Sequence, residues 1–302
     1  MAESRLSILG GGRAGLTLAV ALAERGLGVD LVARRLERRH AVAAWLPRGL
    51  EIRLQETLVA AERVVIAVPD RALAAVVAAL PPAPPAAIWL HLSGAVPWQV
   101  LRRAGGAAEI GALHPLAALT DPLDLGDAAR TARPLCGATF AVAGTAAAEQ
   151  WALALVARLG GEAVVVADGS RALYHAAAAL AANDLVALLA VAEQAAVAAG
   201  LPQSAARRGL THLAQTALDA VRRLPAETPW TAGLTGAVAR GDADTLAGHL
   251  AALWRFDPAA AALHRDLSRQ LLELVRQGGT LRPASLAALD VVLAGGPPEE
   301  AQ

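Results

Sequence analysis

The sequence contains no lysine: all 27 of its basic side chains are arginines, and 27 aspartates and glutamates balance them to a formal net charge of zero. A lysine general acid, a Schiff-base lysine and a lysine phosphate ligand are therefore excluded. A neutral balance also lacks the basic surface by which proteins bind nucleic acid or anionic membranes. We expect a small molecule as the partner, and neither nucleic acid nor a membrane.

Cysteine and uninterrupted apolar runs are also scarce. The single cysteine, Cys136, cannot form an internal disulfide, which is typical of a protein from the reducing cytoplasm. The first apolar run is short and leads directly into a glycine turn, so we expect no signal peptide. The most apolar stretch, residues 72–96, is interrupted by four prolines, and we expect no membrane span and a cytoplasmic location.

A metal site is not expected either. Three of the histidines, His212, His249 and His264, lie on helical patterns with no acidic, histidine or cysteine partner at a ligand-like spacing.

The most informative stretch lies near the start of the chain. A short apolar run, Leu6–Leu9, ends in Gly10-x-Gly12-x-x-Gly15, and a long Ala/Leu helix pattern follows. In a dinucleotide-binding unit the first glycine permits the tight turn, the second lets a pyrophosphate approach the backbone, and the third lets helix and strand pack closely. The free N–H groups at the helix start then face the phosphates.

The first half of the chain alternates strand and helix patterns, which predicts an α/β fold with a doubly wound parallel sheet. After the first strand we expect strands over residues 29–33, 63–68, 87–92, 109–113, 140–143 and 163–167. Beyond residue 168 the strand patterns vanish, and helices are expected over residues 171–199, 204–223, 243–254, 258–277 and 283–293. We therefore predict a Rossmann domain over residues 1–168 and an all-helical domain for substrate binding and dimerisation over residues 169–302.

The residues around the second strand favour NADP over NAD. An acid about 20 residues after the glycine turn usually binds the ribose hydroxyls of NAD, but Asp30 lies at the start of this strand. Arg34 lies at its end, where a guanidinium suits a 2′-phosphate, while Arg38 and Arg39 fit a solvated helix face. The expected NADP contacts are Gly10, Gly12, Arg13, Ala14, Gly15, Arg34, Val68, Pro69 and Ser93.

Ligands of such sheets bind at the carboxyl ends of the strands, which directs attention to two polar residues. Ser93 follows one expected strand, where its hydroxyl suits either the nicotinamide ribose and substrate or a structural turn. His114 follows the next, with Pro115 behind it, and suits either proton donation to a reacting oxygen or a structural hydrogen bond.

A second group of polar residues lies on the first long helix. His175 and Asn183 are eight residues apart, which places them on roughly the same face of an α-helix whose other residues are largely alanine. Substrate binding and an interhelical hydrogen bond both explain polar groups on such a helix. His175 is the stronger candidate of the neighbouring pair, because simple packing also explains Tyr174.

A last candidate segment lies between two expected helices of the second half. Arg240 suits a substrate carboxylate, with Thr235 nearby in sequence as a further substrate contact. Asp242 is expected to cap the following helix.

Taken together, these motifs resemble the 6-phosphogluconate-dehydrogenase-like superfamily, and in particular Rossmann-like reductases whose helical second domain is known only as a domain of unknown function. The motifs that carry the resemblance are Gly10–Gly15, Ala67–Asp70, His91–Gly94, Leu113–Pro115, Tyr174–Ala177, Asn183, Leu234–Gly236 and Arg240–Asp242. The resemblance implies an NADP-binding Rossmann domain, followed by a helical domain that forms a homodimer.

Three relatives suggest the chemistry. Ketopantoate reductases carry a catalytic lysine followed by asparagines four and eight residues later, and the corresponding residues here are His175, Ala179 and Asn183. Prephenate and arogenate dehydrogenases carry a His-Pro pair similar to His114-Pro115, whose histidine bonds the substrate hydroxyl. Pyrroline-carboxylate reductases share the overall plan without either histidine.

Three functional hypotheses follow. The first is NADPH-dependent reduction of a small keto or imino acid, possible substrates including one like ketopantoate, with His175 or His114 as proton donor, Asn183 orienting the substrate and Arg240 holding its carboxylate. The second is oxidation in the manner of prephenate or arogenate dehydrogenase, centred on His114. The third is a non-catalytic NADP-binding sensor or scaffold.

Overall fold

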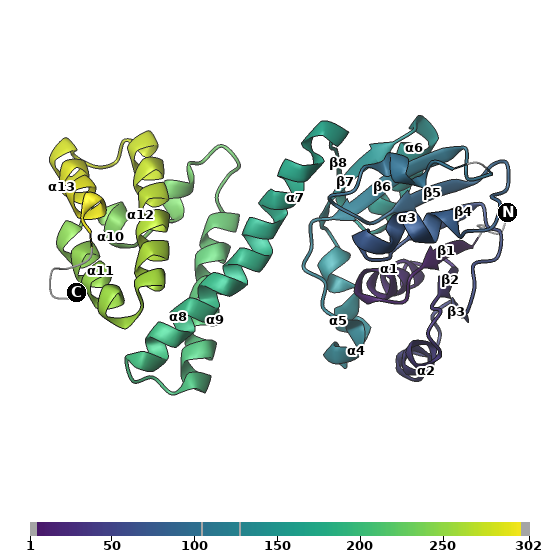
Figure 1. The fold of residues 1–302 in the computed structure, drawn as a ribbon, viewed down its shortest axis with the longest axis horizontal. Helices are drawn as coiled ribbons and strands as arrows, with labels where there is room; N and C mark the ends of the chain where they lie inside the picture. The colour runs from purple at the N-terminus through teal and green to yellow at the C-terminus, as the bar shows by residue number, and fades with distance from the viewer. Residues whose placement is uncertain (1–4, 104, 127, 297–302) are drawn as a thin grey trace. The chain divides into compact units, whose positions relative to one another are not determined.

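The computed structural model describes residues 5–103, 105–126 and 128–296, and the chain divides into two compact units between residues 182 and 183. Figure 1 shows the strands gathered in the first unit and helices alone in the second. The strands end close to the predicted domain boundary at residue 168, but the first compact unit continues through the next helix. The domain boundary at residue 168 therefore stays a prediction.

Eight strands form one sheet in the first unit. They are β1 (Leu6–Leu9), β2 (Val29–Val32), β3 (Ile52–Gln55), β4 (Arg63–Ile66), β5 (Ile88–His91), β6 (Glu109–Pro115), β7 (Thr139–Gly144) and β8 (Glu162–Val165). The spatial order is β3-β2-β1-β4-β5-β6-β7-β8, and every neighbouring pair is parallel except β6–β7. The predicted α/β fold is confirmed. The sequence patterns missed β3, a four-residue edge strand that is only half-buried, and the antiparallel pairing of β7.

The helices of the first unit are α1 (Arg13–Ala23), α2 (Leu36–Trp45), α3 (Asp70–Ala78), α4 (Pro122–Leu125), α5 (Ala128–Thr131), α6 (Ala146–Arg158) and α7 (Arg171–Ala179). Among them, α1 and α6 cover one face of the sheet and α3 covers the other. Alternate residues of one strand point to opposite faces. In β4, Val65 joins the core that includes α1 and α6, while Val64 and Ile66 join the core beneath α3. Burial on both faces explains why the strands are continuous apolar runs in the sequence.

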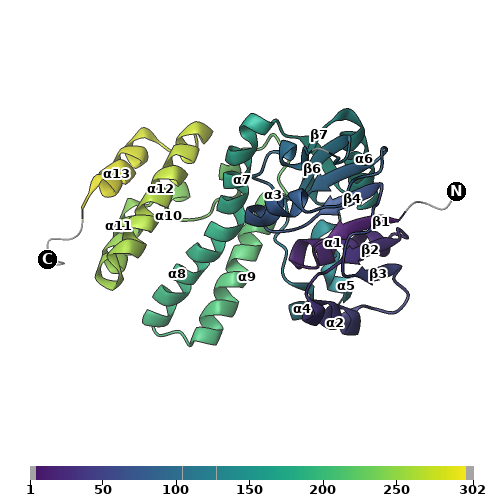
Figure 2. The same cartoon turned by 45° about the vertical axis from the view of Figure 1, so that its right-hand side comes forward.

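The second unit contains helices only among its described residues. They are α8 (Leu185–Ala198), α9 (Gln203–Arg222), α10 (Ala237–Arg240), α11 (Ala243–Phe256), α12 (Pro258–Gly278) and α13 (Pro283–Ala294). The last four build its core around buried residues such as Leu246, Leu272 and Leu289. Figure 2 shows α8 and α9 running side by side as a hairpin, and they contact each other in the structure.

The helix expected over residues 171–199 is present but changes character midway. A π-helical segment, Leu180–Asp184, separates α7 from α8. Within the described residues, Asp168–Ala198 is the one helical stretch long and apolar enough to cross a membrane, and none of its most apolar window is buried. The chain is nevertheless folded as a globular α/β protein, and length and composition alone are weak support for a membrane span.

Candidate active site at the carboxyl ends of the central strands

The glycine turn after β1 has the geometry that its spacing predicts. Gly10 has φ +127°, and a Cβ there would lie 2.2 Å from the carbonyl oxygen of Ala67 at the end of β4. A Cβ on Gly15 would lie 1.8 Å from the carbonyl oxygen of Gly10, so only glycine lets α1 pack this closely. A Cβ on Gly12 would meet nothing within 4 Å. Gly12 therefore borders open space rather than packed backbone.

That open space lies at the start of α1. Arg13 and Ala14 form its first turn, which carries no acidic residue and no side-chain cap. Backbone N–H groups that lack a partner at a helix start attract anions. Val68 borders the turn from the end of β4, since its Cγ1 would lie 3.5 Å from a Cβ on Gly10, and Pro69 precedes α3. The residues present fit a dinucleotide pyrophosphate.

The charges around β2 favour a phosphate over ribose hydroxyls as the ligand at its end. The Asp30 carboxylate accepts a 3.0 Å bond from Nε of Arg5, so it is already engaged near the start of the strand. The Arg34 side chain is exposed and makes no hydrogen bond or ion pair with the described residues. It is therefore free to bind an anion.

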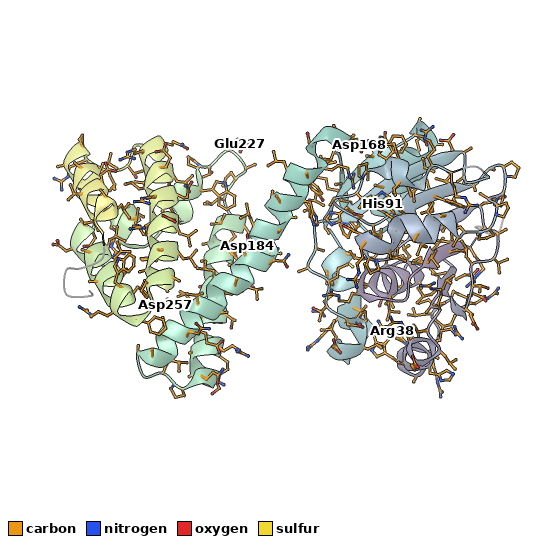
Figure 3. All side chains as sticks on the ribbon, in the orientation of Figure 1. Arg38, His91, Asp168, Asp184, Glu227 and Asp257 are labelled. Carbon is orange, nitrogen blue, oxygen red and sulfur yellow. The ribbon has the colours of Figure 1, made fainter. Side chains whose placement is uncertain are left out.

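Arg38 does not lie on a solvated face, as its pattern suggested, and that interpretation is wrong. Its Nε donates to the carbonyl oxygen of Gly11 at 2.7 Å, and its Nη2 lies 2.8 Å from Oδ1 of Asp121. Figure 3 labels this side chain on α2. Arg38 thus ties the glycine turn to the segment before α4.

The two predicted catalytic histidines lie close together in the first unit. The rings of His114 on β6 and His175 on α7 are 5.8 Å apart between centroids. Both face Gly94, where a Cβ would lie 2.8 Å from Nε2 of His114 and 2.7 Å from Nδ1 of His175. Nδ1 of His114 lies 2.7 Å from the hydroxyl oxygen of Tyr174. Tyr174 therefore belongs to the site rather than to packing alone.

The antiparallel partner of β6 sets the position of His114. The strand runs two residues further than expected, because His114 pairs with Ala141 and Pro115 with Phe140 of β7. His114 is therefore part of the sheet and not the first residue of a loop, and it pairs with β7 beyond the point where the pairing with β5 ends at Ala112.

Arg171 is a buried cation that the sequence patterns did not single out. Its Nη2 donates to the carbonyl oxygen of Ser93 at 2.6 Å, and the residue is 1% exposed. Its Nε and Nη1 are buried without a hydrogen-bond partner among the described residues. The nearby Asp168 accepts a hydrogen bond from Gln99. A clue in the sequence was an arginine opening an otherwise apolar helix.

Ser93 acts in the turn after β5. Its Oγ accepts the N–H groups of Ala95 and Val96 at 3.2 and 3.0 Å, as expected if its hydroxyl is structural. The hydroxyl hydrogen remains available to a ligand, so the turn does not exclude the predicted contact with cofactor or substrate.

His91 is a second buried polar group, and its sequence pattern did not single it out as a candidate site residue. It is fully buried at the end of β5, and its Nδ1 accepts the N–H of Ser93 at 3.1 Å. Figure 3 labels it in the sheet region. Burial, reinforced by the charge of Arg171, lowers the pKa of His91 from 6.5 to about 4. The only sign in the sequence was a polar residue closing an apolar strand.

The pKa of His114 is lowered for similar reasons. Burial contributes most, followed by His175 and then Arg171, while Asp70 acts in the opposite direction; together they lower the pKa from 6.5 to about 4. His114 is therefore a neutral imidazole near neutral pH, with one N–H and one lone pair. Burial raises the pKa of the Tyr174 hydroxyl, and the charge of Arg171 opposes that rise.

The other predicted site residues belong to the second unit. Asn183 is exposed within the π-helical segment, so the α-helical spacing that placed it on the face of His175 does not hold. Arg240 donates to the carbonyl oxygen of Thr235, and both residues are exposed. Asp242 caps α11 by accepting the N–H of Thr245 at 3.0 Å, which confirms its expected role. No group of three or more potential metal ligands gathers among residues 5–103, 105–126 and 128–296.

Comparison with known proteins agrees with this geometry. Residues 138–271 match the family model described as a domain of unknown function (DUF2520). No curated protein matches.

Solved structures match over nearly the whole chain. Protein TM1727 of Thermotoga maritima has a TM-score of 0.68 at 20% identity, over 90% of this chain and 99% of its own. BF3122 of Bacteroides fragilis, provisionally named an NADP oxidoreductase, has a TM-score of 0.65 at 19% identity, over 88% and 97%. Pyrroline carboxylate reductase of Plasmodium falciparum, solved with NADP bound, has a TM-score of 0.55 at 12% identity, over 97% and 98%.

These findings define the class of protein. The strand order, the glycine turn and the neighbours are those of a Rossmann-type dinucleotide-binding fold with a helical C-terminal region. Within that class, residues 138–271 are similar to the domain of unknown function DUF2520, and the match begins just before β7.

The buried His91 makes folding depend on pH. Its pKa is 6.5 when unfolded and about 4 when folded. Between pH 6.5 and about 4, His91 binds a proton in the unfolded chain but not in the folded one. The free energy of unfolding therefore falls as the pH drops through this range, by about 3 kcal/mol from this residue. We expect urea unfolding of His91→Asn, whose amide oxygen can replace Nδ1 as acceptor, to lose less stability over this range than wild type. Equal losses in the two proteins would contradict this account.

Proposed function

We propose that this protein binds NADP(H) and catalyses reduction of a small keto or imino acid. The observation that carries the proposal is the meeting of His114, Tyr174 and His175 at the carboxyl ends of the strands, the edge of the sheet that also holds the glycine turn. Dinucleotides and their substrates bind at this edge in open α/β sheets. The relatives named above support the cofactor class but share at most 20% identity with this chain.

The chain's own residues divide the work. Gly10, Gly12 and Gly15, with the start of α1, hold the pyrophosphate, and Arg34 binds the 2′-phosphate through its unoccupied guanidinium. The residues Arg13, Ala14, Val68, Pro69 and Ser93 complete the cofactor contacts. NADPH, when bound, supplies the hydride.

The substrate end of the site needs a proton donor and a carboxylate ligand. His114 or His175 donates the proton to the carbonyl oxygen or imine nitrogen. Asn183, Arg240 and Thr235 belong to the second unit, and their roles in orienting the reacting group and binding its carboxylate stay predictions. The substrate class that fits these roles best is a 2-keto acid similar to ketopantoate.

One observation favours a second candidate. Because the pKa of His114 is about 4, its imidazole is neutral near neutral pH and can accept a proton from a hydroxyl. Oxidation of a hydroxy acid, in the manner of prephenate or arogenate dehydrogenases, would use that base.

The test is a panel of 2-keto acids, imino acids, prephenate and arogenate, assayed with NADPH or NADP⁺ by absorbance of the reduced nicotinamide. We expect turnover of at least one keto or imino acid, and His175→Gln to lower it roughly 100-fold if His175 is the donor. His40→Gln, at an exposed position on α2, is the control that should leave turnover unchanged. Tight NADPH binding without any turnover would instead support a sensor or scaffold.

The choice of NADP over NAD depends on Arg34. Arg34→Ser removes the guanidinium proposed for the 2′-phosphate, so we expect the Kd for NADPH to rise about tenfold or more, with the Kd for NADH little changed. Fluorescence titration of the reduced nicotinamide measures both. Tighter binding of NADH than NADPH by the wild type would show that the assignment is wrong.

We also propose that the protein is a homodimer joined through its helical region, as expected of a cytoplasmic enzyme of this class. The hairpin α8–α9 exposes large apolar side chains, among them Val186 at 68% and Leu213 at 63%. An exposed apolar surface of this kind is typical of an interface. A second copy is the occupant we favour over lipid, because the hairpin also carries the ion pair between Glu193 of α8 and Arg207 of α9, which suits an aqueous interface better than a bilayer.

Sedimentation equilibrium should give twice the chain mass for wild type. Leu213→Arg should shift the protein towards monomer by placing a charge in the interface. Arg208→Ala, at an exposed position on the same helix, is the control and should leave the dimer unchanged. A wild-type monomer that instead floats with lipid vesicles would indicate a membrane as the occupant.

A further inference from the structure

We propose that Tyr174 and His114 form a proton relay, in which His114 delivers a proton to the substrate and Tyr174 replaces it, while the buried Arg171 stabilises the tyrosinate that results. This inference rests on the proposed function but is argued from contacts within the first unit alone.

The relay starts from the contact between Nδ1 of His114 and the Tyr174 hydroxyl. The 2.7 Å separation is that of a well-formed hydrogen bond, and the two rings meet edge to face at 88°. Nε2 makes no hydrogen bond with the described residues and faces the backbone of Gly94. One nitrogen of His114 is therefore engaged by Tyr174, and the other is left for a ligand.

The charge state of His114 explains why a partner is needed. A neutral imidazole that gives up its Nε2 proton becomes an imidazolate, which is too basic to form unless Nδ1 gains a proton at the same time. The Tyr174 hydroxyl is the group hydrogen-bonded to Nδ1 among the described residues. Donation by Tyr174 also fixes the tautomer, since Nδ1 then accepts and Nε2 carries the proton.

The charges around the pair favour the product of this step. Arg171 is buried and has two nitrogens without hydrogen-bond partners, and its charge favours the ionised form of Tyr174. The other groups acting on His114 are His175 and Asp70. His91 is a further neighbour of the pair, neutral near neutral pH because its pKa is about 4. Arg171 is thus the cation placed to offset a tyrosinate in a buried setting.

The step balances as follows. As the substrate carbon accepts the hydride, its oxygen or nitrogen takes the Nε2 proton of His114, and the N–H bond breaks. The O–H bond of Tyr174 breaks as its proton forms a new bond to Nδ1, so His114 ends neutral with its proton on Nδ1. Tyrosinate remains beside Arg171 until water returns a proton. The reverse sequence serves an oxidation.

The chain offers a direct probe, because Tyr174 is its single tyrosine. Ultraviolet titration of the protein without cofactor follows tyrosinate formation at this site alone. We expect Arg171→Gln to raise the pKa of Tyr174 by about one unit or more. Arg171→Lys keeps the charge should the first variant unfold, and should shift it less, while the exposed Arg53→Gln should not shift it. No difference between wild type and Arg171→Gln would overturn the role of Arg171.

Heteronuclear NMR of histidine-labelled protein reports the tautomer without any substrate. We expect His114, identified by the signal that His114→Gln removes, to carry its proton on Nε2. A proton on Nδ1 would make Tyr174 the acceptor and overturn the relay, whether or not the protein proves to be a reductase.

Activity then tests the relay separately from the proposed function. Tyr174→Phe should lower turnover about 100-fold while the Kd for NADPH stays unchanged. The residual rate should rise as pH falls towards about 4, because only a protonated His114 can then donate. Turnover within a few-fold of wild type, with no change in the pH profile, would refute the relay and leave the reductase proposal standing.

Discussion

The hydrogen bond from the buried Arg171 to the carbonyl oxygen of Ser93 joins the two parts of the candidate site. It fixes the first turn of α7 against the turn that follows β5, and Tyr174 and His175 lie on the next turn of that helix. Burying a guanidinium is costly unless it is hydrogen-bonded and opposed by charge. The positive charge of Arg171 lowers the pKa values of His91 and His114 and opposes the rise in the pKa of Tyr174. One buried cation therefore influences three ionisable groups of the candidate site.

The charge of Arg171 matters to the proposed chemistry because the chain contains no lysine that could act as the proton donor. A lysine donor carries its own proton at neutral pH, whereas a buried histidine with a pKa of about 4 does not. A site built on such a histidine needs a second group to renew the proton, and a tyrosine with a neighbouring cation supplies one. The proposed proton relay therefore follows from two features of the chain: it has no lysine, and it buries Arg171.

The fold and the glycine turn could be predicted from local rules. Glycine spacing, alternating strand and helix patterns and the loss of strands after residue 168 depend on short-range sterics and on burial of both sheet faces, and each is visible in a few consecutive residues. The edge strand β3 was not predicted, because its four residues are only partly buried and form no clear apolar pattern. The hydrogen bonds of Arg38 could not be predicted, because its partners, Gly11 and Asp121, are distant in sequence.

By itself, the sequence determined the α/β class, the position of the glycine turn, the helical second half and the two histidines at the site. Only the tertiary structure decided that these histidines meet over Gly94, that Tyr174 is bonded to one of them, and that Arg171 lies buried behind them. The physical reason is that propensity and periodicity act between neighbours in sequence. Burial and electrostatic fields act between neighbours in space, and here those neighbours come from β5, β6 and α7.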